Sequence, residues 1–297
     1  MTGWSRLRDP RFFAAAGDAD GREWIDALPG LMDSTCREWD LIVAGPPGSG
    51  FHSMTLPVTR RGEPCLLKLV WPNETAAMEI LALETWDGQG AVRLLDASVD
   101  QGMMLLEQLD ASRPLTTVSL MEAAAIAGQL IRQLAIPAPP GPPRLGDVAG
   151  EIADSLLSRD TRTGRTVPQA WAEDAASLAR QLSSIRSGGL LVHTDLHYGN
   201  ILAGDRDPWL AIDPKPAVGD PERAVAELLW TRADELNSAD DVRALLRAIV
   251  AAAGLDAERA RAWGIVRTID YWLWGLEHGL TEDSRRCRAV AAALLAY

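Results

Sequence analysis

The sequence predicts an α+β protein with two lobes, a small β-rich lobe over residues 1–109 and a larger α-helical lobe over residues 110–297. Two observations support this prediction. Short apolar runs separated by turns rich in Gly and Pro dominate the first part, and apolar residues at helical spacing dominate the second. A chain of 297 residues is long enough for two such lobes.

The N-terminal lobe begins with a predicted helix over residues 20–38, where apolar residues recur at i, i+4 and i+7. Pro29 leaves open whether this is one helix or two. A meander of strands follows, with one inserted helix over residues 74–87 that Asn73 caps. The strands are expected over residues 40–44, 53–59, 65–70, 91–96 and 103–108.

The C-terminal lobe is predicted to be mostly helical. Two short apolar runs, residues 190–192 and 209–212, flank a polar loop that contains glycine. Helices are expected over residues 115–134, 148–158, 171–185 and from residue 223 onward. The polar loop is therefore the natural place for chemistry in this lobe.

Composition narrows the function class. The chain has 29 Lys and Arg against 41 Asp and Glu, a net charge of −12, which argues against nucleic-acid binding and permits a cationic small-molecule partner. Its three Cys show no C-x-x-C spacing, and an odd number without such spacing suggests free thiols in a reducing compartment. With no signal-peptide pattern or long apolar stretch, we expect a cytoplasmic protein without a membrane partner, as a monomer or weak dimer.

The strongest motif is the polar loop itself, which carries His193, Asp195, His197 and Asn200, followed 13 residues later by Asp213. Phosphoryl transfer needs a carboxylate that orients the acceptor hydroxyl and takes its proton, and oxygen ligands for Mg²⁺. The order His193-x-Asp195-Leu-x-x-x-Asn200 resembles the catalytic loop of protein kinases. This resemblance implies that Asp195 is the base, that Asn200 and Asp213 hold Mg²⁺, that His193 supports the loop and that His197 assists the transferred phosphate.

Two alternatives remain open for this loop. His193, Asp195 and His197 alternate along the chain and could hold Zn²⁺ in a metal-dependent hydrolase, although the chain has only four His in all. A surface turn with no catalytic role is the other alternative.

The predicted nucleotide-binding residues lie in the N-terminal lobe. Lys68 stands in an apolar strand, as does the phosphate-binding lysine of protein kinases, and the chain has only one other lysine, Lys215, against 27 Arg. Its acidic partner is expected on the next helix at Glu79, with Glu74 and Glu84 as alternatives.

A glycine-containing loop over residues 45–50 is expected to cover the phosphates, because glycine lets backbone N–H groups approach them. The residues assigned to this loop are Gly48, Ser49 and Gly50. The adenine is expected against the backbone of the lobe connection, at Glu107 and Leu109. The loop could equally be an ordinary hairpin connection.

Taken together, the chain resembles the aminoglycoside phosphotransferases, and among them the streptomycin 6-phosphotransferase and hydroxyurea phosphotransferase group. The stretches that carry the resemblance are residues 65–72, 90–96, 193–200 and 209–221. The resemblance implies a two-lobed protein-kinase-like fold. It also implies transfer of the γ-phosphoryl group of ATP (or GTP) to a hydroxyl of an antibiotic, with Mg²⁺. Thr194 and Ala224 depart from the group's usual Gly and Asp, and His278 stands where an acid is more common.

The substrate prediction is a cationic, hydroxyl-bearing antibiotic such as a streptomycin-like aminoglycoside. Carboxylates of the helical lobe would pair with its cationic groups and a tryptophan would offer a ring face. The residues assigned to the substrate are Lys215, Asp234, Glu235, Asp270, Trp274 and Glu277. The alternatives are a kinase of another antibiotic or small metabolite, hydroxyurea-like or nucleoside-type, and a nucleotide-binding sensor without catalysis.

Overall fold

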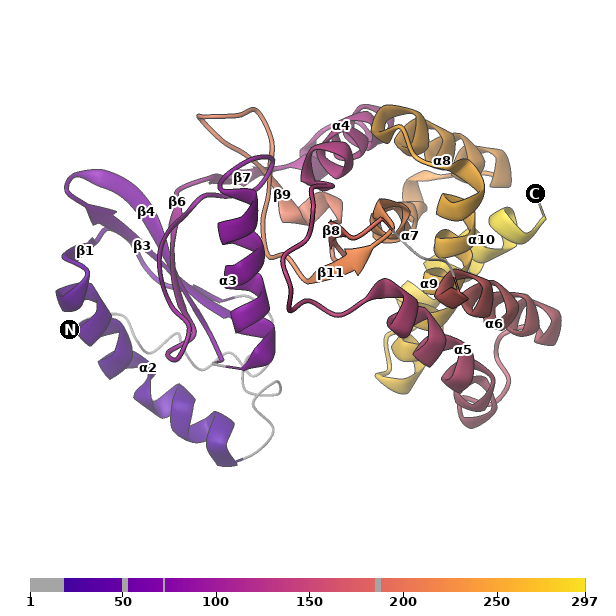
Figure 1. Cartoon of the computed structure of the whole chain (residues 1–297), viewed down its shortest axis with the longest axis horizontal. Helices are drawn as coiled ribbons and strands as arrows, with labels where there is room; N and C mark the ends of the chain where they lie inside the picture. Colours follow the sequence, from indigo (N-terminus) through magenta and orange to yellow (C-terminus); the bar gives the residue numbers. More distant parts are fainter. Residues whose placement is uncertain (1–18, 50–52, 72, 185–187, 297) are drawn as a thin grey trace. The chain divides into compact units, whose positions relative to one another are not determined.

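The computed structural model describes residues 19–49, 53–71, 73–184 and 188–296 (Figure 1). The chain divides into two compact units, residues 1–109 and 110–297. The first is built on an antiparallel sheet and the second mostly on helices. This confirms the predicted α+β class. Among the described helices, none combines the length and the apolar character that crossing a bilayer requires.

The sheet of the first unit runs in the order β1-β3-β4-β6-β5, with β2 paired to β3 and every pair antiparallel. Two helices accompany it, α2 (Ala19–Glu38) and α3 (Glu74–Trp86). The strands are β1 (Leu41–Val43), β2 (Gly48–Ser49), β3 (Ser53–Arg60), β4 (Glu63–Val70), β5 (Leu94–Ser98) and β6 (Met103–Glu107). The helix α2 is continuous through Pro29, which settles the open question of one helix or two.

The central hairpin of this sheet follows from its sequence. Arg61 and Gly62 both have positive φ angles, 55° and 86°, as a two-residue hairpin turn of the type I′ class requires. On β3, Met54, Leu56 and Val58 are buried and alternate with more exposed neighbours. They pack into a core that also includes residues of α2, β4 and β6. The strand β4 is therefore an inner strand of the sheet, with β3 on one side and β6 on the other.

One strand boundary differs from the prediction over residues 91–96. The strand β5 begins at Leu94, and the register of its pairing with β6 shifts between Leu94 and Asp96. Ahead of it, the Glu107 side chain accepts a hydrogen bond from the Arg93 backbone N–H at 2.7 Å. The Glu107 carboxylate therefore accepts the hydrogen bond of a backbone N–H that would otherwise bond to a neighbouring strand.

The second unit is assembled around the long helix α9 (Ala257–Glu277), most of whose apolar side chains are buried. The other helices are α4 (Leu120–Leu134), α5 (Leu145–Arg162), α6 (Gln169–Ser184), α7 (Val225–Trp230), α8 (Ala239–Ala253) and α10 (Thr281–Leu295). The helix predicted from residue 115 is split, because a separate 3₁₀ turn, Leu115–Thr117, precedes α4.

Two small sheets in this unit were not predicted in full. One has the order β10-β9-β7 and the other pairs β11 with β8, all antiparallel. Their strands are β7 (Asp110–Pro114), β8 (Leu190–His193), β9 (Ile201–Ala203), β10 (Leu210–Ala211) and β11 (Pro216–Gly219). Between them they position the polar loop that the sequence singled out.

Candidate active site

The polar loop is held by the pairing of β8 with β11, in which His193 lies opposite Pro216. Immediately beyond this pair, the Thr194 backbone N–H and hydroxyl both donate to the Lys215 carbonyl oxygen, at 2.9 and 2.8 Å. The Lys215 ammonium in turn lies 2.7 Å from a carboxylate oxygen of Asp195. The hydroxyl of Thr194 thus supplies a bond that glycine at this position could not make.

His193 fixes the loop from the buried side. Its Nε2 lies 3.0 Å from the Ile212 carbonyl oxygen, and its Nδ1 accepts the Asp195 backbone N–H at 3.2 Å. These two bonds require a neutral ring protonated on Nε2. Burial lowers the pKa of His193, which favours the same neutral form. Both ring nitrogens are therefore engaged by the backbone.

Asn200 connects the loop to the strand that leads to Asp213. Its side-chain Nδ2 donates to the Asp195 backbone carbonyl oxygen at 3.0 Å, while the backbone carbonyl oxygen of Asn200 accepts from the Ile212 N–H at 2.9 Å. Asp213 follows Ile212 with φ at +54°, a left-handed conformation that Asp tolerates better than most residues. The side-chain nitrogen of Asn200 thus binds the loop, and its side-chain oxygen is the atom that could bind a cation.

The ionisation of Asp195 is set by two opposing effects. Burial acts to raise the pKa of the Asp195 carboxyl, but the Lys215 ammonium outweighs it and holds that pKa below its ordinary value. Asp195 is therefore an anion at neutral pH. With Asn200 and Asp213 on adjoining backbone, the segment offers amide and carboxylate oxygens, the donor set that suits Mg²⁺.

His197 occupies the middle of the loop and caps the 3₁₀ turn Tyr198–Asn200, because its Nδ1 accepts the Gly199 N–H at 3.1 Å. Burial lowers the pKa of His197. Within the described residues no group of three or more His, Cys, Asp or Glu side chains could hold a metal ion. Since His193 has no ring nitrogen to spare, this geometry does not support the zinc-hydrolase alternative.

The first unit contains a second group of predicted residues. Lys68 on β4 and Glu79 on α3 form an ion pair of 2.5 Å, with side chains only 5% and 8% exposed. Asn73 caps α3 by accepting the Ala76 N–H at 3.0 Å, as expected. Of the three glutamates considered on this helix, the structure thus brings Glu79 to the lysine, while Glu74 and Glu84 are exposed.

The remaining nucleotide-binding candidates are distributed over this unit. Gly48 and Ser49 form β2, where a side chain at Gly48 would lie 2.9 Å from the Thr55 hydroxyl; Gly50 lies outside the described residues. Glu107 ends β6. Leu109 is buried, and its carbonyl oxygen accepts a hydrogen bond from the side chain of the preceding residue.

The acids assigned to the substrate differ from the expectation of free carboxylates. Asp270 is buried and forms ion pairs with both Arg159 and Arg267. Glu277 contacts Arg159 at 2.9 Å and Arg162 at 3.6 Å. The pKa of Glu277 is lowered, in the first place by its hydrogen bond to Arg159. Both carboxylates are therefore neutralised by arginines of this chain.

The other two acids are paired in the same way. Asp234 contacts Arg285 and Arg286, and its lowered pKa reflects first its hydrogen bond with Arg286. Glu235 contacts Arg232 at 2.6 Å. A chain with 27 Arg places guanidinium groups within reach of each of these acids, so none of the four stands as an unpaired anion.

Trp274, the tryptophan predicted to offer a ring face to the substrate, lies among other aromatic rings. It stacks on Tyr271 on one side, with ring centroids 5.2 Å apart, and on His278 on the other, at 4.3 Å. Tyr271 stacks in turn on Trp230, at 5.1 Å. Successive stacking contacts thus link the four rings, while Trp274 itself remains 39% exposed.

A buried ion pair near the loop was not predicted from the sequence. Glu227 on α7 lies 2.6 Å from Arg223 and 3.5 Å from Arg267, and all three side chains are largely buried. Its negative charge also acts on His197, whose pKa it tends to raise against the effect of burial. The i,i+4 spacing of Arg223 and Glu227 was the available signal.

Two groups of residues, one in each unit, define a class of protein. A buried Lys–Glu pair on a small sheet, and an Asp-x-x-x-x-Asn loop followed by a second Asp in a helical unit, are the residues of kinase-like phosphotransferases. The chain belongs to the aminoglycoside/hydroxyurea antibiotic resistance kinase family, whose profile matches residues 38–279. This confirms the resemblance and identifies the protein as an O-phosphotransferase. Membership of a kinase family implies ATP as donor.

Relatives of known activity cover most of the chain. It is 40% identical to a hydroxyurea phosphotransferase of Kitasatospora aureofaciens, over 94% of this chain and 82% of the relative. It is 38% identical to a streptomycin 6-kinase of Streptomyces glaucescens, over 90% of this chain and 89% of the relative.

Solved structures show the same fold at lower identity. An aminoglycoside phosphotransferase APH(4)-Ia mutant, in a ternary complex with ADP and hygromycin B, gives a TM-score of 0.60 at 15% identity and covers 88% of this chain and 97% of that one. A choline kinase of Streptococcus pneumoniae gives 0.59 at 13% identity, covering 91% and 99%. These likenesses confirm the kinase-like fold.

Proposed function

We propose that this protein phosphorylates a hydroxyl group of a small antibiotic, with ATP as the donor and Mg²⁺ held by Asn200 and Asp213. The observation that carries the proposal is the fixed, ionised state of Asp195. Its backbone is held by His193 and Asn200, and its carboxylate by Lys215 at 2.7 Å. A carboxylate held in this way can orient a hydroxyl and take its proton.

Other residues would bind the nucleotide phosphates and Mg²⁺ and neutralise the charge of the transferred group. Lys68, held by Glu79, would bind the α- and β-phosphates as a compact ammonium. Bound Mg²⁺ would supply charge neutralisation at the phosphates, and the oxygen donors of Asn200 and Asp213 suit it. Lys215 reaches Asp195 and so would neutralise charge beside the transferred group. His197, neutral and partly buried, would limit water around the loop.

The molecule that accepts the phosphoryl group can be of two kinds, neutral or cationic. The activities of the relatives point to hydroxyurea, a small neutral molecule, and to streptomycin, which carries guanidinium groups. A cationic acceptor would have to displace an internal arginine from Asp234, Glu235, Asp270 or Glu277. Both acceptors should therefore be tested in the same assay. For the nucleotide donor, Gly48, Ser49 and Gly50 are the proposed contacts.

The test is a coupled assay of nucleoside diphosphate formation with streptomycin, hydroxyurea and a panel of other hydroxyl-bearing antibiotics, followed by mass spectrometry for a phosphate adduct. We expect diphosphate and adduct to form together with at least one compound, and only with Mg²⁺ present. Nucleotide binding without transfer to any compound would contradict the proposal and favour a sensor. Activity that requires stoichiometric Zn²⁺ and no nucleotide would favour a hydrolase.

A further inference from the structure

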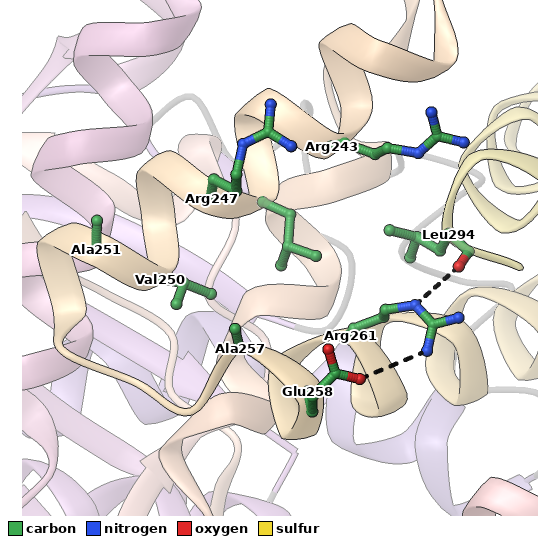
Figure 2. Close-up of a pocket in the computed structure, with 9 residues that line it drawn as sticks. Arg243, Arg247, Val250, Ala251, Ala257, Glu258, Arg261 and Leu294 are labelled. Carbon is green, nitrogen blue, oxygen red and sulfur yellow. Dashed lines mark hydrogen bonds and ion pairs between the residues drawn. The ribbon is translucent and has the colours of Figure 1, made fainter. Parts of the chain in front are cut away.

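The helical unit contains a cavity of about 320 Å³ that the phosphotransferase chemistry does not use. Figure 2 shows residues that line it from three helices: Arg243 and Arg247 belong to α8, Glu258 and Arg261 to α9, and Leu294 to α10. None of its lining residues belongs to the segments that carry Asp195, Asn200 or Asp213. Its volume lies within the range of small-molecule sites.

The walls of this cavity are apolar. Leu246 and Leu294 are buried at 6% and 0% exposure, whereas the small side chains at Ala251 and Ala257 are exposed at its opening. Val250 completes the wall on α8. A ligand that enters therefore exchanges water for apolar surface over most of its body.

The charged side chains around the cavity are mainly cationic. Arg243 has partners already: its Nε donates to the Ala293 carbonyl oxygen at 3.1 Å, and its guanidinium group lies 2.8 Å from a carboxylate oxygen of Asp240. Arg261 donates to the Leu294 carbonyl oxygen at 2.9 Å and lies 3.9 Å from Glu258, contacts that Figure 2 draws as dashed lines. These two guanidinium groups hold the end of α10.

Arg247 differs from the other two arginines. It is exposed, and in the described part of the chain it makes no hydrogen bond or ion pair. Asp240 and Glu258 thus pair with Arg243 and Arg261, and the exposed guanidinium group of Arg247 remains beside the cavity. An exposed guanidinium group next to apolar walls favours an anion with an apolar body.

From this combination we propose that the cavity binds an amphipathic monoanion, a carboxylate carried on a compact aliphatic body. The aliphatic body lies against Leu246, Val250 and Leu294, and the carboxylate meets the fork of Arg247, which can donate two parallel hydrogen bonds. A cation is excluded by the same guanidinium groups. A neutral molecule of the same shape gains the apolar contacts alone.

The test uses octanoate as the probe and isothermal titration calorimetry on the full-length protein, with octanamide as the neutral counterpart. We expect octanoate to bind in a one-to-one ratio and octanamide at least about tenfold more weakly, because it cannot form the charged pair. Raising the salt concentration should weaken octanoate binding. Arg247→Gln should weaken it by about tenfold, and Ala251→Trp, which fills the opening, should abolish it.

The matched control is Arg288→Gln, because Arg288 is also exposed, lies on α10 and does not line the cavity. It should bind octanoate as the unaltered protein does, and circular dichroism should show all variants folded. Three outcomes would overturn the proposal: no octanoate binding at millimolar concentration, equal binding of octanamide, or equal losses in the Arg247 and Arg288 variants. Because no nucleotide is present, this result is independent of the proposed kinase reaction.

Discussion

The Lys68–Glu79 ion pair allows stability to be separated from function. Its side chains are 5% and 8% exposed and its charged atoms are 2.5 Å apart, so either single neutral substitution leaves a charge buried without this partner. Removing one member of such a pair costs about 3–5 kcal/mol, a large share of the about 5–15 kcal/mol that stabilises a domain. We therefore expect Lys68→Met and Glu79→Leu each to unfold at markedly lower urea concentration.

The double variant Lys68→Met/Glu79→Leu should behave differently. Replacing both members of a buried ion pair by apolar residues of similar size ranges from neutral to stabilising. We expect urea unfolding of the double variant to return close to that of the unaltered protein, while nucleotide-dependent transfer stays lost because the ammonium is gone. A double variant as unstable as the sum of the singles would refute the structural reasoning. Transfer at the original rate would refute the role of Lys68.

Further predictions concern the helical unit. Asn200→Ala and Asp213→Ala should each raise the Mg²⁺ concentration needed for half-maximal transfer, since each removes an oxygen donor, and a Mg²⁺ titration of the rate measures this. Asp195 must be ionised to accept a proton, and Lys215 keeps its pKa low, so Lys215→Met should move the acid limb of the pH–rate profile to higher pH, whereas Lys215→Arg should move it less. Glu227→Gln breaks a buried pair and should lower the free energy of unfolding by about 3–5 kcal/mol, measured in urea.

The sequence predicted the larger elements well because their patterns are long. The alternation on β3 and the turn at Arg61 and Gly62 determine the central hairpin, and the apolar periodicity of α3 places Glu79 on the strand-facing side. The strands β9 and β10 contain only 3 and 2 residues, too few for a periodic signal. Their existence depends on pairing with segments elsewhere in the unit.

The environment of the site residues was less predictable than their identity. The motif placed Asp195 and Asn200 together, but the ion pair with Lys215 follows from the register of β8 against β11. The pairing of Asp270 with Arg159 joins residues 111 positions apart. No local pattern shows such a contact, and for this reason the acids were expected to be available to a substrate.

The stacked rings illustrate the same limit. The spacing of Tyr271 and Trp274 on α9, and of His278 at its C-cap, indicates one helix face, but it does not show that Trp230 extends the stack from another helix. Residue type alone suggested a ring face for a cation, and it did not show that Tyr271 and His278 both stack on the Trp274 ring.

The most direct test of the central claim is the turnover of Asp195→Asn beside its nucleotide affinity. The matched control is Asp205→Asn, an exposed acid in the loop between β9 and β10. We expect Asp195→Asn to lower the turnover number by about 10²–10⁴-fold while ATP binds as tightly as before, and the control to keep both the turnover number and the ATP affinity. Turnover of Asp195→Asn equal to that of the control would contradict this expectation.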